Sequence, residues 1–86
     1  MKTLILDYIQ DPGHGWVALH RSRVREIEYT PTAYSYVSRD GSVYFLEEDC
    51  DAPRALALLK DKGYTVNLRS VYQQDTPIRR MRSAAS

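Results

Sequence analysis

The chain has 86 residues, a formal net charge of +1 at pH 7 and one cysteine, and 43% of its residues are hydrophobic. This length suits one domain with a small core, and the composition excludes a disordered or fibrous chain. A single cysteine cannot form an internal disulfide, and we find neither a signal peptide nor the run of roughly 18 apolar residues that a membrane span needs. We therefore expect a cytoplasmic protein with no membrane partner.

Positive charge gathers toward the C-terminus. Residues 1–50 carry five basic and eight acidic side chains, for −3, whereas residues 51–86 carry seven basic and three acidic ones, for +4. After residue 75 only Ile78 and Met81 are large apolar side chains, too few to offset the entropy lost on ordering. We expect one globular domain over residues 1–75 and a basic, flexible tail over residues 76–86.

The N-terminal third predicts two strands. Lys2–Gln10 is rich in β formers and apolar on both faces, as in a central strand. Asp11–Gly15 is a turn, because proline fixes φ and the two glycines permit positive φ. Trp16–Leu19 is a short second strand. Arg21–Ile27 then forms one or two helical turns, or the strand continues through Glu28.

A β-hairpin follows. Two β-rich runs, Tyr34–Ser38 and Ser42–Glu47, flank an Asp-Gly dipeptide, which is typical of hairpin turns. A two-residue loop would pair Arg39 with Ser42, whereas a three-residue loop with the glycine in a bulge would pair Ser38 with Ser42. We prefer the second register because it separates an aliphatic face from a face of tyrosines.

The clearest element is an amphipathic helix over residues 52–62. Asp51 can cap its first turn, and Gly63 can end it in the left-handed conformation. Its apolar face is formed by Ala52, Ala55, Leu56 and Leu59. A strand over Tyr64–Gln73 follows, with alternating apolar residues. These elements predict an α+β fold, an antiparallel sheet of three or four strands with one helix packed on one face.

The preferred register gathers aromatic side chains on the sheet face that one helix cannot cover. Exposed aromatic patches often mark binding surfaces. We expect the main contact with a partner to come from Tyr34, Tyr36, Tyr44, Arg39 and Trp16. The alternatives are that these rings cover the far side of the core, that they form a homodimer interface, or that they stack on nucleic-acid bases while Arg79, Arg80 and Arg82 contact phosphates.

No group in the sequence has a visible activating neighbour. The acidic run around Glu47 lacks the spacing of a calcium loop and suits the positive end of the following helix, so we expect no metal site. Cys50 has acidic neighbours, which disfavour a thiolate, and nothing in the spacing brings His14 or His20 close to it. We therefore expect no catalytic residue, no cofactor and no enzymatic activity.

Three runs taken together, DPGHGW at residues 11–16, YSY at 34–36 and YFLEEDCDA at 44–52, resemble small uncharacterised proteins encoded by phages, prophages and plasmids of proteobacteria. The resemblance spans roughly Asp11 to Gly63 and implies no catalytic residue. It implies a mobile-element origin, and such elements carry many small inhibitors of host machinery, including anti-CRISPR proteins. We therefore expect a non-enzymatic binding protein with a protein partner, acting as such an inhibitor. The alternative is a nucleic-acid-binding module.

Overall fold

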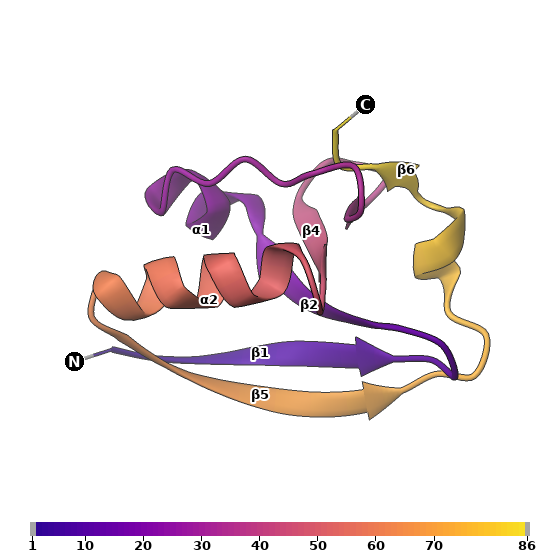
Figure 1. Cartoon of the computed structure of the whole chain (residues 1–86), viewed down its shortest axis with the longest axis horizontal. Coiled ribbons are helices and arrows are strands. Elements are labelled where there is room, and N and C mark those ends of the chain that lie inside the picture. The colour runs from indigo at the N-terminus through magenta and orange to yellow at the C-terminus, as the bar shows by residue number, and fades with distance from the viewer. Residues whose placement is uncertain (1, 86) are drawn as a thin grey trace.

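The computed structural model describes residues 2–85, and within them a sheet wraps around one long helix (Figure 1). The elements in chain order are β1 (Lys2–Gln10), β2 (Gly15–His20), α1 (Arg21–Glu26), β3 (Tyr36–Val37), β4 (Val43–Glu47), α2 (Asp51–Asp61), β5 (Tyr64–Tyr72), a short 3-10 helix η1 (Pro77–Arg80) and β6 (Arg82–Ser83). None of the helices described is long and apolar enough to cross a membrane.

The sheet has six strands within the described residues, in the order β5-β1-β2-β4-β3-β6. Neighbours are antiparallel except β1 and β5, which pair in parallel along nine residues, from Lys2 opposite Tyr64 to Gln10 opposite Tyr72. The predicted antiparallel sheet of three or four strands is therefore wrong. The sheet is mixed and larger, and two helices accompany it.

The parallel pair follows from the path of the chain. α2 leaves the end of β4 and returns the chain across the sheet to the edge beside β1, so β5 starts at the same end as β4 and runs the same way. A helical crossover of this kind joins parallel strands. The alternation of residues 64–73 predicts a strand but carries no information on its direction. The two-residue strands β3 and β6 are too short to show any period.

The core lies between α2 and the sheet. The buried face of α2 is Ala52, Ala55 and Leu59, close to the predicted face, and α2 itself lies within one residue of its predicted bounds. This face packs on Val17, Leu19, Leu46 and Tyr64 of the sheet and on Val24 and Ile27 of α1 and its end. Burial of these side chains contributes about 25 cal/mol per Å² of apolar surface. For residues 21–27 the sequence left a helix or a continued strand open, and the structure has the helix, α1.

Asp51 has a different role from the predicted cap. The residue that precedes α2 is Cys50, whose side chain makes no capping bond, and the Asp51 carboxylate is fully buried. It accepts hydrogen bonds from the hydroxyls of Tyr29 and Ser35, and from the Thr32 backbone N–H at 3.0 Å and Thr32 hydroxyl at 2.9 Å. These four donors bind the irregular segment before β3 to the first turn of α2.

The carboxylate is ionised because of these donors. Burial by itself would raise the pKa of Asp51, but the hydrogen bonds from Ser35, Tyr29 and Thr32 outweigh it and hold that pKa below its usual value. Burial and the bond to Asp51 raise the pKa of Tyr29 to about 12, so its hydroxyl stays a donor.

The C-terminal segment crosses the sheet end and becomes part of its far edge. Gln73 N–H donates to the Gln10 carbonyl at 2.8 Å, and β6 pairs with β3. Thr76 and Ile78 are buried. We expected residues 76–86 to be a flexible tail, whereas the structure gives residues 77–83 regular elements and an anchoring side chain.

We predict that Asp51→Asn lowers the free energy of unfolding at pH 7 by about 2–4 kcal/mol, because an amide replaces a buried charge that four donors surround. Since the native pKa of Asp51 lies below the unfolded value of about 3.9, its contribution is complete above that value and disappears as pH falls through the native pKa. Urea titrations followed by fluorescence of the single tryptophan, Trp16, measure this.

The matched control is Asp61→Asn, an exposed carboxylate at the other end of α2, which should change stability by less than about 0.5 kcal/mol. The difference between wild type and Asp51→Asn should narrow below about pH 4. A difference that stays constant down to pH 2 would show that the stability lost does not depend on the ionised carboxylate.

We predict that Ile78→Ala costs about 2–4 kcal/mol, because the side chain is buried under the C-terminal segment. Arg80→Ala, two residues on and exposed, should cost less than about 0.5 kcal/mol. Chemical denaturation measures both, and amide hydrogen exchange of residues 77–83 reports their mobility directly. If the two variants are equally stable and the amides of residues 77–83 exchange without protection, the C-terminal segment is flexible, as expected from the sequence.

Candidate binding groove and the predicted site residues

The hairpin adopts the register that we did not prefer. β3 and β4 pair Tyr36 with Phe45 and Val37 with Tyr44, one residue away from the preferred pairing. This is the alignment expected for the two-residue loop. In the same alignment Ser38 lies opposite Val43, and its N–H donates to the Val43 carbonyl at 2.9 Å. Since neighbouring residues of a strand point to opposite faces, Tyr36 and Tyr44 lie on opposite faces of the sheet.

Polar groups in the loop account for this register. The Asp40 carboxylate accepts from the hydroxyls of Ser38 and Ser42 at 2.8 and 2.7 Å and from the Ser42 N–H at 3.0 Å. These bonds lower the pKa of Asp40 to about 2. Gly41, at a φ of 77°, completes the turn by donating to the Ser38 carbonyl. The serine and aspartate side chains therefore decide the alignment. The criterion that we used, which places the tyrosines together on one face, does not.

The five residues predicted to bind a partner are dispersed. Tyr34 is 70% exposed, just before β3, and Arg39 is exposed in the hairpin loop. Tyr36 is half-buried, with its ring edge against Trp16 at 6.3 Å between centroids. Tyr44 packs against the core beside α1. Trp16 is only 2% exposed, so it is a packing residue and presents almost no surface to a partner.

The three arginines predicted to contact phosphates also differ. Arg79 donates to the buried carboxylate of Asp11, with Nη2 3.0 Å from Oδ1, and its guanidinium lies over the Trp16 ring at 5.6 Å. The bond from Arg79 holds the pKa of Asp11 well below its usual range. Arg80 pairs with exposed Asp75 at 3.3 Å. Arg82 makes no ion pair within residues 2–85 and lies near the hairpin loop, with Nη2 3.6 Å from the position of a Cβ on Gly41.

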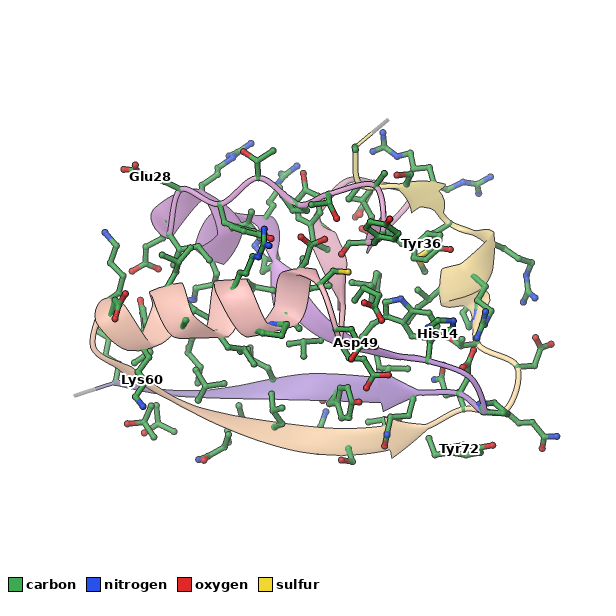
Figure 2. All side chains as sticks on the ribbon, viewed as in Figure 1. His14, Glu28, Tyr36, Asp49, Lys60 and Tyr72 are labelled. Atoms are coloured by element: carbon green, nitrogen blue, oxygen red, sulfur yellow. The ribbon has the colours of Figure 1, made fainter. Side chains whose placement is uncertain are left out.

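A first concavity of about 390 Å³ lies where β2 begins, and Figure 2 shows His14, Tyr36 and Asp49 on its sides. Glu47 and Asp49 line it, and their carboxylates lie within 4.8 Å of each other and of the Glu48 carboxylate. Two of these carboxylates already accept hydrogen bonds from the protein. Glu47 Oε1 accepts from the N–H groups of Asp49 and Cys50, and Glu48 accepts from the Tyr8 hydroxyl. Burial and the Glu47 carboxylate raise the pKa of the Cys50 thiol, so it stays protonated and a poor nucleophile.

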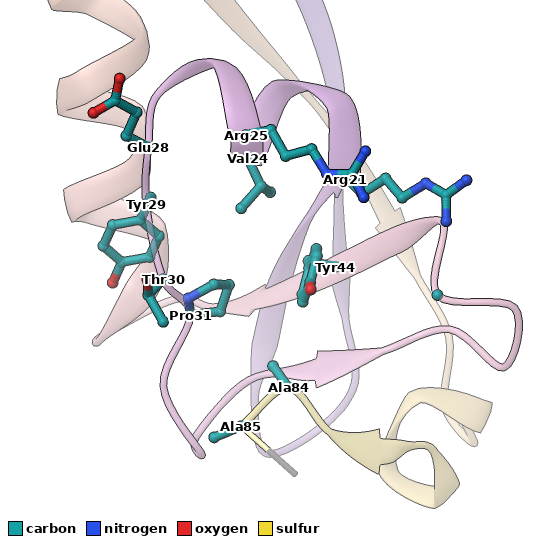
Figure 3. A pocket seen from close by; sticks show the side chains of 11 residues that line it. Arg21, Val24, Arg25, Glu28, Tyr29, Thr30, Pro31, Tyr44, Ala84 and Ala85 are labelled. Carbon is teal, nitrogen blue, oxygen red and sulfur yellow. The ribbon is translucent and has the colours of Figure 1, made fainter.

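A second concavity of about 630 Å³ is the basic groove, which Figure 3 shows from close by. α1 forms one side with Arg21, Val24 and Arg25, and the irregular segment Glu28–Pro31 forms another. The remaining lining comes from Gly41 and Tyr44 of the hairpin and from Ala84 and Ala85. The bonds of Asp51 to Tyr29 and Thr32 hold the irregular segment in place, so the wall of the groove depends on that carboxylate.

No sequence pattern pointed to this groove. Arg21 and Arg25 become neighbours only if residues 21–26 are helical, and the C-terminal residues reach the groove only because β6 pairs with β3. Glu28 is the one described residue other than glycine with positive φ, at 53°, and this left-handed residue ends α1 and turns the chain along the groove.

Comparison of the chain with protein-family models, with curated proteins and with solved structures found no match. The similarity to phage and plasmid proteins therefore stays a hypothesis, and the function has to be argued from the geometry.

We predict that Tyr44→Ala lowers the free energy of unfolding by about 2 kcal/mol, because its ring packs against the core cluster. Tyr34→Ala should change it by less than about 0.5 kcal/mol, since that ring is mostly in water. Thermal melts followed by circular dichroism compare the two. Equal losses would mean that the hairpin has the other register, with both rings on one face.

Proposed function

We propose that this chain is a small non-enzymatic binding protein that acts through a protein partner, and that it binds an extended segment of that partner along β5. The observation that carries the proposal is the position of β5. It is nine residues long and, in the part of the chain that the structure describes, it stands at the outer edge of the sheet and pairs with β1 alone.

Within residues 2–85, the backbone groups of β5 that point away from β1 pair with no other strand. Gln73 N–H, just after the strand, donates inward to the Gln10 carbonyl. Because backbone groups of successive residues point to alternate sides, the N–H groups of Leu68, Ser70 and Tyr72 point outward. A row of this kind is a template for an added strand, the mode of recognition that gives affinity through main-chain bonds.

The side chains beside the edge fit the same mode. Leu68 is 46% exposed and Tyr72 64% exposed, and Figure 2 shows Tyr72 at the outer margin of the sheet. Between α2 and β5 lies a concavity of about 390 Å³ lined by Leu56, Lys60, Tyr64, Thr65, Val66 and Leu68. An added strand would place alternate side chains over this concavity, which supplies the specificity that backbone bonds lack.

β5 also lacks the usual protection of an edge strand. It contains no proline, and its single charged residue, Arg69, is paired with Asp7 of β1 at 2.7 Å. Natural edges are commonly blocked by proline or by unpaired charge. Occupying a partner's segment in this way needs no catalytic group, and it is how we propose that the protein would inhibit a host assembly.

The nucleic-acid alternative has less support. Arg79 and Arg80 are bound to Asp11 and Asp75, and Tyr36 and Tyr44 lie on opposite faces, so the expected aromatic and basic surface is divided.

We predict that Ser70→Pro abolishes partner capture, because proline removes one outward N–H and places its ring at the edge. Ser70→Ala keeps the N–H and should capture as wild type does. Tagged proteins are used for affinity purification from a proteobacterial lysate, with and without nuclease, and urea titration confirms that Ser70→Pro is folded.

Bands shared by wild type and Ser70→Ala, resistant to nuclease and absent with Ser70→Pro support the proposal. Capture that survives Ser70→Pro, or that nuclease removes, overturns it. Light scattering of the purified protein measures whether it is a monomer or a dimer. A wild-type dimer that becomes a monomer in Ser70→Pro would mean that a second copy of the chain, and not a different protein, occupies the β5 edge, which also overturns the proposal.

A further inference from the structure

The basic groove contains positive charge that nothing in the described residues balances. Arg21 and Arg25 stand one helical turn apart on α1, and within residues 2–85 neither makes an ion pair or a side-chain hydrogen bond. Like charges at this spacing repel each other. Figure 3 shows both side chains on the Tyr44 side of the groove, while Glu28 lies at its opposite end. Arg82 adds a third unpaired guanidinium near the Gly41 end.

The acids nearby do not cancel this charge. Glu28 is exposed at the far end of the groove, and Asp40 Oδ1 accepts hydrogen bonds from Ser38 and Ser42 in the hairpin loop. Within residues 2–85 neither acid forms an ion pair with an arginine of the groove. Guanidinium groups bind phosphate oxygens through paired N–H donors, more strongly than neutral donors do. Two of them beside one cavity are the arrangement expected for a phosphate group.

The remainder of the groove suits a flat, partly polar body attached to that phosphate. Tyr44 gives an aromatic surface, and Val24, Pro31, Ala84 and Ala85 give an apolar lining. The hydroxyls of Tyr44 and Thr30 make no hydrogen bond to any described residue, so both can bind a ligand. A volume of about 630 Å³ lies within the range of small-molecule sites.

We propose that the basic groove binds a phosphorylated molecule with a planar ring, the chemistry of a 5′-mononucleotide, either free or at the end of a strand. Arg21 and Arg25 hold the phosphate, Tyr44 stacks on the ring, and the hydroxyls of Thr30 and Tyr44 bind the sugar or ring edge. This inference stands on residues remote from β5 and does not depend on the partner proposed there.

The test is a titration of the whole chain, observed by amide chemical shifts, with AMP, adenosine, inorganic phosphate and a 5′-phosphorylated tetranucleotide. We expect AMP to bind with saturable shifts at residues 21–31 and 41–44. Adenosine should bind at least about ten-fold more weakly, because it has no phosphate for the two arginines. If AMP binds and the tetranucleotide does not, the ligand is a free nucleotide. If the 5′-phosphorylated tetranucleotide shifts the same residues and its unphosphorylated form does not, the ligand is the 5′ end of a strand.

The variant Arg21→Gln with Arg25→Gln should weaken AMP binding at least about ten-fold. Its matched control, Lys2→Gln with Lys62→Gln, removes two exposed charges outside the groove lining and should stay within about two-fold, because screened charges at a distance contribute little. Equal losses in both double variants, equal binding of AMP and adenosine, or no saturable shift with any probe would overturn the proposal.

Discussion

The buried carboxylate of Asp51 is the constraint on which the rest of the structure depends. A charge removed from water is costly unless it is fully hydrogen-bonded, and four donors from Tyr29, Thr32 and Ser35 satisfy this one. The Ser35 hydroxyl also accepts from the Glu47 N–H at 3.0 Å. One carboxylate thus joins the first turn of α2, the end of β4 and the irregular segment that forms a wall of the basic groove. This explains how that segment holds its position without regular secondary structure.

Elements with a clear period could be predicted from the sequence, whereas their arrangement could not. The spacing of Ala52, Ala55 and Leu59 was sufficient for α2, and alternation was sufficient for β5. The direction of β5 depends on where α2 returns the chain, which is a tertiary property. β3 and β6 are two residues each and exist because they pair with each other and with β4. The partners of Asp51 lie 16–22 residues away in sequence, so a local capping rule could not find them.

The candidate site was predicted less well, and one residue of register explains much of the error. With side chains alternating along a strand, a shift of one position transfers Tyr44 from the face of Tyr36 to the core. The basic residues show the same limit. Arg79 was grouped with Arg80 and Arg82 because they are close in sequence, yet Asp11, 68 residues away, binds it. Arg21 and Arg25 were not singled out from the sequence, because no local pattern connects them with Tyr44.

The two proposed binding surfaces lie near opposite edges of the sheet. β5 is one edge strand and β6 the other, with four strands between them, or about 20–25 Å at the usual strand spacing. A small molecule beside α1 and β6 therefore cannot touch a segment added to β5. Coupling between the sites would need an element with two arrangements that both ligands bias. The direct connection is the chain after β5, and buried Thr76 and Ile78 fix it to the sheet. With that connection anchored, we expect the two ligands to bind independently, and a nucleotide that changed the affinity for a β5 partner would have to release this segment first.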